Sequence, residues 1–317
     1  MVAVARVILR SVGGFVVTLI AASVIVFAAT TILPGSVANA ILGQQATPEM
    51  VKAIEHRLHL DEPAPQRYAR WLAGMAHGDF GTSLTANQPV ADLVWPRFRN
   101  TAALAAAAFL AAVPLSIALG IMGGLKAGSW IDQVISGITL AMLSIPEFVV
   151  GTVLVFAFAI TIPLLPAITL VDRNLVPVSF ASALILPTLA LTFSLLAHTG
   201  RLVRTIVQET QASDYMRFAT LKGLTTGRLI FRHLLPNVLP PVLSVVALNV
   251  GWLLSGVVVV EAVFNYPGVG TLIVSAVNDR DVPVVQAIAL LLGAIYILAN
   301  TLADLISRAI NPVLRGS

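Results

Sequence analysis

Six long stretches that are nearly free of charged residues decide what this chain can fold into. They cover residues 11–33, 100–125, 133–171 (interrupted only by Glu147), 174–200, 234–260 and 282–303. A helix needs about 20 mostly apolar residues to cross the hydrocarbon core of a bilayer, and each stretch is long enough. Pro163 and Pro166 are expected to end the third helix near residue 162. The sequence therefore predicts six transmembrane helices.

The composition agrees with an all-α polytopic membrane protein. Only 11% of the 317 residues are charged and 57% are hydrophobic, whereas about a quarter of the residues of a typical soluble domain are charged. The net charge of +4 is explained by cytoplasmic Lys and Arg that orient the chain, so it does not indicate nucleic-acid binding. Because the chain has no cysteine, disulfides, thiolate metal sites and cysteine nucleophiles are excluded.

Basic residues predict the orientation in the membrane. With the N-terminus inside the cell, most Lys and Arg fall in cytoplasmic stretches, and the two short outer loops hold only Arg173 and Arg280. The first apolar run is too long for a typical signal peptide, so an uncleaved span is expected. Both termini are then cytoplasmic. The expected divisions are 1–33 for the N-terminus and first span, 34–99 for an outer segment, 100–308 for a five-span core and 309–317 for a cytoplasmic tail.

The outer segment is predicted to contain short helices. Thr47-Pro48-Glu49 combines an N-cap residue, Pro at the first helical position and an acid in the first turn. A second helix is expected over residues 65–77, with Gly78 as its stop. A third short helix near Val90 is expected to lead into the second span. This small helical cap serves either as a docking surface or as a cover for the spans.

The stretch 201–236 is the only long cytoplasmic loop that the sequence predicts. Within it, Ser213 can cap a helix that has Asp214 in its first turn and Lys222 in its last, and Gly223 suits a left-handed position after the helix end. The expected helix therefore runs from Asp214 to Lys222. A second helix, capped by Thr225 or Thr226, is expected to end at Pro236.

The predicted helix Asp214–Lys222 carries Tyr215, Phe218 and Ala219 on one face. A short capped helix with an aromatic face fits a groove on a partner protein. The alternative is a solvated basic loop that only obeys the positive-inside rule. The two exposed aromatic residues favour a partner.

Several stretches resemble one family of membrane proteins. Residues 214–224 (DYMRFATLKGL) and 233–237 (HLLPN) resemble the coupling loop of ABC-importer permeases, and in particular the B-type inner-membrane permease of the dipeptide/oligopeptide/nickel group. Further similar stretches follow in the family's order. They are LDEP at 60–63, QRY at 66–68, GDFGTS at 78–83, SIP at 144–146, EAVFNYPGVG at 261–270 and RDVP at 280–283. The chain departs from the family in Ser36-Val37 after Pro34-Gly35, and in the run FATL at 218–221.

The resemblance implies a transmembrane subunit that forms half of a translocation pathway in the cytoplasmic (inner) membrane of a bacterium. Its partners would be a second homologous permease, two ATP-binding subunits, an extracytoplasmic solute-binding protein and membrane lipid. The substrate would be a di- or oligopeptide, with nickel, glutathione or another small solute as the alternative. The residues that couple to the ATPases would be Asp214, Tyr215, Arg217, Phe218, Ala219, Lys222, Gly223 and Leu224.

Neither catalysis nor a cofactor is expected in the chain itself. It has no phosphate-binding loop of the G-x-x-x-x-G-K-[ST] type, so ATP and Mg would be used by the partner ATPases. A secondary carrier usually needs several buried acids, and this chain offers one. Ser144, Ser194 and His198 form no recognisable hydrolase site, and no His/Asp cluster has metal-ligand spacing. A self-sufficient carrier or membrane hydrolase is therefore disfavoured.

Ionisable groups inside predicted spans are candidates for function because they are costly to bury in lipid. Glu147, which follows Pro146, lies either on a substrate path or in a hydrogen-bonded packing niche. His198 is expected to pack near the cytoplasmic end of the fourth span, and Asp304 to pair with Arg308.

The loop between the last two spans is a second candidate site. Glu261 and Asp281 flank it, and Pro267, Gly268 and Gly270 lie in a Pro-Gly-Val-Gly run. The run either lines an outer gate, docks a binding protein or forms a simple tight turn.

Overall fold

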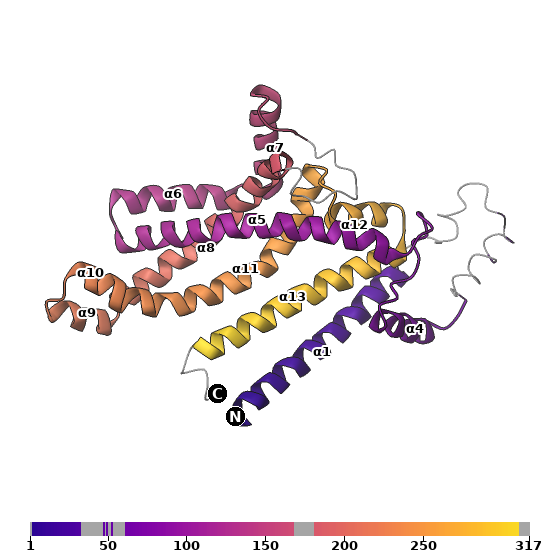
Figure 1. Ribbon diagram of the computed structural model, residues 1–317, viewed down its shortest axis with the longest axis horizontal. Coiled ribbons are helices and arrows are strands. Elements are labelled where there is room, and N and C mark those ends of the chain that lie inside the picture. The colour runs from indigo at the N-terminus through magenta and orange to yellow at the C-terminus, as the bar shows by residue number, and fades with distance from the viewer. Residues whose placement is uncertain are drawn as a thin grey trace. The chain divides into compact units, whose positions relative to one another are not determined.

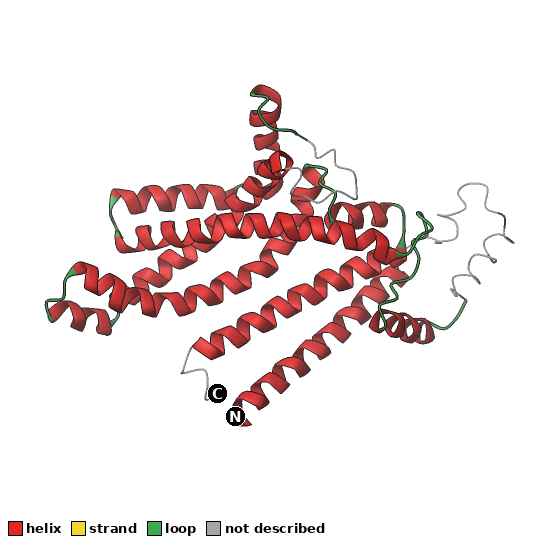
Figure 2. Cartoon of the chain, viewed as in Figure 1, coloured by secondary structure: helices red, strands yellow, loops and turns green. Residues whose placement is uncertain are grey.

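The computed structural model describes residues 2–32, 47, 49, 52, 61–167 and 181–310, with the side chains of 11–32, 47, 49, 52, 61–167 and 182–305. Across these residues the ordered elements are helices, apart from one isolated β-bridge between Thr82 and Pro89 (Figures 1 and 2). The all-α prediction is confirmed. The helices are α1 Val2–Ile32, α4 Ala64–Ala76, α5 Val90–Leu125, α6 Trp130–Ser144, α7 Glu147–Val155, α8 Ala181–Ala212, α9 Asp214–Leu221, α10 Thr226–Arg228, α11 Leu235–Val263, α12 Val269–Asn278 and α13 Val282–Ile310, with π-helical segments η2 Phe156–Thr161 and η4 Leu229–Leu234.

Five helical stretches are long and apolar enough to cross a membrane. They are Ser11–Thr31, Val90–Leu125, Ser182–Ala212, Thr226–Val263 and Val282–Leu305. A sixth candidate consists of α6 and α7–η2, which are bent by 96° at a short break and end at Thr161. The helix bends because Pro146, which precedes α7, has no N–H to continue the hydrogen-bond ladder. Counting this pair as one broken span gives the six spans that the sequence predicts.

Three helix boundaries differ from the sequence predictions. Helix α5 begins at Val90 and continues without a break to Leu125, so the short outer helix and the second span are one element. Helix α8 continues to Ala212, well into the predicted loop. The second loop helix does not end at Pro236 but continues through η4 into α11. Pro236 lies in the first turn of α11, directly after the π-helical segment η4.

The chain divides into two compact units. The first holds the described residues up to Thr101 together with Pro267–Ile297, and the second holds the described residues between Ala102 and Tyr266 and those from Leu298 onward. Parts of the expected outer and terminal segments lie outside the described residues. These are most of the helix predicted from Thr47, Arg173 and the tail beyond residue 310, and the side chain of Arg308 is also outside the description.

In the first unit, α4 packs on α1 through aromatic side chains. The ring of Phe27 lies 5.4 Å from Tyr68 and 5.8 Å from Trp71, and Tyr68 forms a 2.8 Å hydrogen bond with Ser23. Helix α4 ends as predicted, with Gly78 at φ +81°. Helix α12, which the sequence analysis missed, is covered by an apolar cluster. This cluster consists of Val90, Val94, Val269, Leu272, Ala276, Val284, Ala287 and Ile288.

In the second unit, α8 is the central helix and packs against α6, α7 and α11. Leu186, Leu191 and Leu195 of α8 share one buried cluster with Leu253, Val257 and Val260 of α11. Towards the other end of α8, Val203 and Val207 lie directly against Gly120 and Gly124 of α5. Glycine is needed at both α5 positions because a Cβ atom would overlap the valine side chains.

Replacing Gly124 with Ala should destabilise the contact between α5 and α8. The added Cβ would lie 2.5 Å from Cγ1 of Val207 and 3.1 Å from the backbone oxygen of Arg204, so the helices must separate. Overpacking of this kind costs about 1–3 kcal/mol. We expect a lower thermal unfolding midpoint in detergent. Gly137→Ala in α6, where a Cβ meets nothing within 4 Å, should not lower it. Equal midpoints for both variants would contradict this packing.

Candidate functional site

The short helix of the 201–236 stretch is built as predicted. Ser213 caps α9 by accepting the backbone N–H of Met216, and Asp214 lies in the first turn. At the other end, Lys222 donates its backbone N–H to Phe218 and Gly223 has φ +70°. This left-handed conformation favours glycine, which explains the residue at this position.

The two faces of α9 have different surroundings. Tyr215, Phe218 and Leu221 are 51%, 65% and 82% exposed, and we call these three residues the outer face of α9. Met216 and Ala219 are buried. The prediction that Ala219 shares the exposed face of Tyr215 and Phe218 is therefore wrong. Its small side chain instead allows the α9 backbone to approach the helices beneath it.

Helix α9 is fastened to α8, η4 and α11. Met216 belongs to a buried cluster with Val203 and Val207 of α8, Leu234 of η4 and Val238 of α11. In addition, the Tyr215 hydroxyl lies 2.6 Å from Nδ1 of His233 in η4, with the two rings 5.6 Å apart. Helix α9 is thus held on one side and exposed on the other. Of the remaining predicted coupling residues, Asp214, Arg217, Lys222 and Gly223 are exposed and Leu224 is half-buried.

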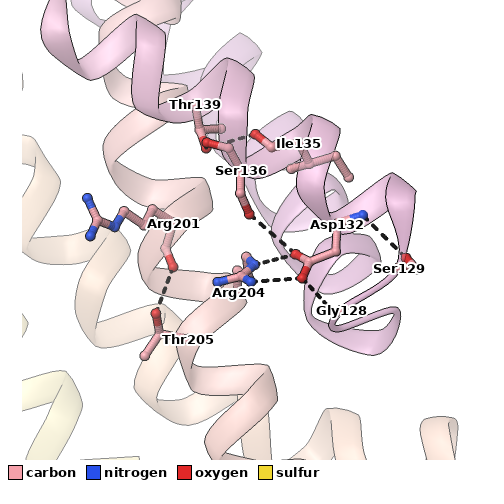
Figure 3. A network of polar contacts seen from close by, with 9 residues as sticks. All are labelled: Gly128, Ser129, Asp132, Ile135, Ser136, Thr139, Arg201, Arg204 and Thr205. Carbon is pink, nitrogen blue, oxygen red and sulfur yellow. Dashed lines mark hydrogen bonds and ion pairs between the residues drawn. The ribbon is translucent and has the colours of Figure 1, made fainter.

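A buried ion pair supports this end of α8 (Figure 3). Arg204 donates from Nε and Nη2 to the two carboxylate oxygens of Asp132, with the Nη2–Oδ2 distance at 2.8 Å. Asp132 is only 4% exposed and also accepts the backbone N–H of Gly128 at 2.9 Å and the hydroxyl of Ser136 at 3.3 Å. The pair therefore ties the turn between α5 and α6 to the part of α8 that carries α9.

Glu147 lies at the break between α6 and α7. Its Oε1 accepts the hydroxyl of Ser194 in α8 at 3.0 Å, and its carboxylate fills the space beside Gly256 of α11. The side chain is half-buried, while the preceding Pro146 is exposed. The structure thus brings Glu147 to the two central helices of the second unit.

His198 lies in the middle of α8, because this helix continues to Ala212, and not near its end as predicted. Its ring stacks on Trp252 of α11 at 5.7 Å and 8°, and its Nδ1 is 3.3 Å from Oδ1 of Asn249. Asn249 in turn donates to the hydroxyl of Thr199 at 2.6 Å. His198 therefore packs between α8 and α11 in the middle of the helix and not at its end.

Asp281 of the loop before α13 organises the first unit. Its carboxylate accepts hydrogen bonds from the hydroxyls of Ser83 and Thr85 and from the backbone N–H groups of Leu84 and Thr85. It is 2% exposed, so it presents no free charge at the surface. The stretches 78–83 and 280–283 thus meet through this carboxylate.

The other predicted residues of the 261–270 stretch do not form a simple turn. Asn265 turns the chain with φ +46°, Gly268 precedes α12, and Gly270 already lies in that helix. The backbone oxygen of Pro267 accepts the side-chain amide of Asn100 at 2.9 Å. Glu261 is fully buried within α11. The expected tight turn over 267–270 is therefore replaced by the start of a helix.

The chain matches one family over almost its whole length. Residues 112–316 match the binding-protein-dependent transport system inner membrane component, and residues 4–105 match the N-terminal part of the membrane component of such systems. The chain belongs to this permease family. It is a multi-pass inner-membrane subunit of an ABC importer and not an enzyme. Permeases of this family work with a binding protein and ATPase subunits.

Relatives of the permease have full-length similarity. The probable peptide ABC transporter permease protein y4tP of Sinorhizobium fredii is 32% identical over 97% of this chain and 98% of its own length. The glutathione transport system permease protein GsiC of Escherichia coli is 34% identical over 95% of this chain and 96% of its own length. A crystal structure of an amino acid ABC transporter with histidines is 16% identical, with a TM-score of 0.46, and covers 71% of this chain and 94% of that chain.

Several polar residues of the permease escaped the sequence analysis. Asp132 is the clearest case, and it had a signal: Ser129-Trp130-Ile131-Asp132 has the spacing of a capping box, and Ser129 does cap α6. No local signal pairs Asp132 with Arg204, which is 72 residues away. Within the part of the chain that the structure describes, no group of three His, Asp or Glu residues is placed to hold a metal ion.

Replacing Arg204 with Gln should destabilise the permease. The substitution leaves the buried Asp132 carboxylate without its cation, and losing one member of a buried pair costs about 3–5 kcal/mol. We expect a clearly lower thermal unfolding midpoint in detergent. The matched control is Arg201→Gln, one turn earlier on α8, where the exposed guanidinium points away from Asp132 (Figure 3). If both variants unfold at the same temperature, the ion pair does not support this end of α8.

Proposed function

We propose that the chain forms half of the translocation pathway of a peptide importer and that α9 receives the motion of the ATPase subunits. One observation carries this proposal: the outer face of α9 is exposed, while Met216 and Ala219 on its other side are buried. A capped helix with an exposed apolar face suits a groove on a partner protein. The full-length relatives that are named as peptide and glutathione permeases support a short peptide as the substrate.

The packing beneath α9 supports transmission of force into the spans. Because Met216 shares a cluster with α8, η4 and α11, α9 cannot shift without moving these elements or opening the cluster. Protein interiors are close-packed and transmit displacement rather than absorbing it. A pair of ATPases that closes on ATP and Mg would therefore move α9 together with α8 and α11. The change would favour one orientation of the pathway because the ATPases bind the two states differently.

The proposed assembly contains this chain, a second homologous permease, two ATP-binding subunits and an extracytoplasmic binding protein. The stretch 201–236 lies in the cytoplasm with both termini, and the loops near residues 86 and 280 lie outside. Nickel, glutathione or another small solute is the alternative substrate. Uptake of radiolabelled dialanine by proteoliposomes that contain the whole importer, its binding protein and ATP tests the peptide proposal. ATP-driven uptake of glutathione or a nickel chelate without uptake of dialanine would overturn it.

Two substitutions in α9 should have different effects. Leu221→Glu places a charge on the exposed outer face, so it should abolish dialanine uptake and leave the thermal unfolding midpoint of the permease unchanged. Ala219→Glu forces a carboxylate into the buried side and should lower that midpoint, because an unpaired buried charge is costly. Uptake, ATP hydrolysis and thermal unfolding are measured on the same preparations. Normal uptake by Leu221→Glu would contradict the docking role of α9.

The predicted orientation can be tested by labelling because the chain has no cysteine of its own. Thr225 and Ala86 are both exposed and lie on opposite sides of the membrane in this proposal. In intact spheroplasts, a membrane-impermeant maleimide should label Ala86→Cys. It should label Thr225→Cys only after the membrane is permeabilised. The opposite pattern would show that the termini lie outside.

A further inference from the structure

A row of polar side chains lies in the middle of three spans of the second unit. Glu147 is near the middle of the broken span formed by α6 and α7–η2, His198 is near the middle of Ser182–Ala212, and Asn249 lies in the middle third of Thr226–Val263. Ser194 and Trp252 complete the row, since each contacts one of these residues. Polar groups at this depth are costly in lipid and face protein or a water-filled path.

These residues occupy consecutive turns of two helices that pack together. Along α8, Ser194 and His198 are four residues apart. Along α11, Gly256 and Trp252 are also four residues apart. Residues at this spacing lie one above the other on the same face of a helix. Glu147 contacts Ser194 and lies against Gly256, and the next turn holds the stacked rings of His198 and Trp252. A carboxylate and an aromatic pair are therefore neighbours along one surface.

The carboxylate of Glu147 has a single hydrogen-bond partner among the described residues. Among the described residues, only Ser194 donates a hydrogen bond to it, at Oε1, and no Lys or Arg lies within ion-pair distance. Glu147 is also the one acidic residue in the middle third of any described span. A neighbouring cation stabilises the charged form of a carboxylate at this depth, and a positively charged group of a passing ligand can supply that cation.

The kind of cation follows from the groups that surround Glu147. A divalent metal ion needs several oxygen or nitrogen ligands, and the described residues hold no group of three acidic or histidine side chains for it. A protonated amine needs only one carboxylate and neighbouring acceptors. The half-buried ring of Trp252 next to it offers an apolar surface for the substituent on the amine.

We propose that Glu147, positioned by Ser194, binds the protonated α-amino group of a peptide as it passes through this half of the pathway, and that the His198–Trp252 pair contacts the adjoining residue of the peptide. This assignment rests on the proposed peptide importer and adds the group that the permease itself recognises. An α-amino group is common to ordinary peptides and to glutathione, so the site suits both substrates named for the relatives.

The test compares two probes that differ only in the amino group. Dialanine carries the amine, and propionyl-alanine has the same skeleton without it. The whole importer with its binding protein and ATP is reconstituted in proteoliposomes, with each probe at saturating concentration. Because the same binding protein delivers the probe to every permease variant, each variant is compared with the wild-type importer for one probe at a time, and the two ratios are then compared.

Replacing Glu147 with Gln keeps the size of the side chain and removes its charge. We expect dialanine uptake to fall at least about ten-fold, because hydrogen bonds to charged groups are among the stronger ones and about 1.4 kcal/mol corresponds to a factor of ten. Uptake of propionyl-alanine should stay within about two-fold of wild type, as follows if the removed charge acts only on the amine. Asp279→Asn, which removes an exposed acid in the first unit, should change neither rate.

A second variant displaces the Glu147 carboxylate and leaves its chemistry unchanged. In Gly256→Ala, the added Cβ would overlap the end of the Glu147 side chain, which is flexible and can move away. Dialanine uptake should therefore fall again relative to propionyl-alanine uptake, with the thermal unfolding midpoint little changed.

The outcomes separate this assignment from the proposed function. An equal loss for both probes in Glu147→Gln, or no loss for either, would overturn the amine site while leaving the peptide importer intact. If the wild-type importer takes up neither probe, the peptide substrate itself is wrong, and the amine site falls with it.

Discussion

The packing of α8 against α11 is the contact on which the rest of the second unit depends. Leucines of α8 and valines of α11 form its apolar core, and the same two helices position the polar groups at Glu147 and His198. The C-terminal half of α8 contacts the glycines of α5 and forms the ion pair with Asp132 before the chain continues into α9. One helix pair thus supports both the candidate docking helix and the candidate substrate surface.

The lipid environment restricts where polar groups can lie in this protein. In lipid every backbone polar group must be satisfied within the protein, which favours helices and makes each break costly. The break at Pro146 is such a site, and the second unit places the Glu147 carboxylate and the Ser194 hydroxyl beside it. Two other buried carboxylates are compensated: Arg204 balances Asp132, and four donors surround Asp281. Glu147 differs from both because, among the described residues, it has a hydroxyl and no cation.

Local signals predicted the elements that depend on local chemistry. Charge-free windows identified the spans, and Ser213 and Gly223 marked the two ends of α9, because caps act within one turn. Predictions failed where distant contacts decide the outcome. Ala219 faces inward because of the cluster around Met216, and Pro236 lies inside a continuous helix because η4 precedes it. Helix α12 was missed because its short apolar face is explained only by the residues that cover it.

The sequence by itself determined that this chain is an all-α membrane protein with a capped helix between its fourth and fifth spans. Hydropathy and capping depend on residues that are close together in the chain, so they can be inferred without knowing the fold. Only the tertiary structure decided which face of α9 is free, that Asp132 pairs with Arg204, and that Glu147 meets Ser194. These contacts join residues that are far apart in sequence, and their partners are selected by helix packing, which no local pattern specifies.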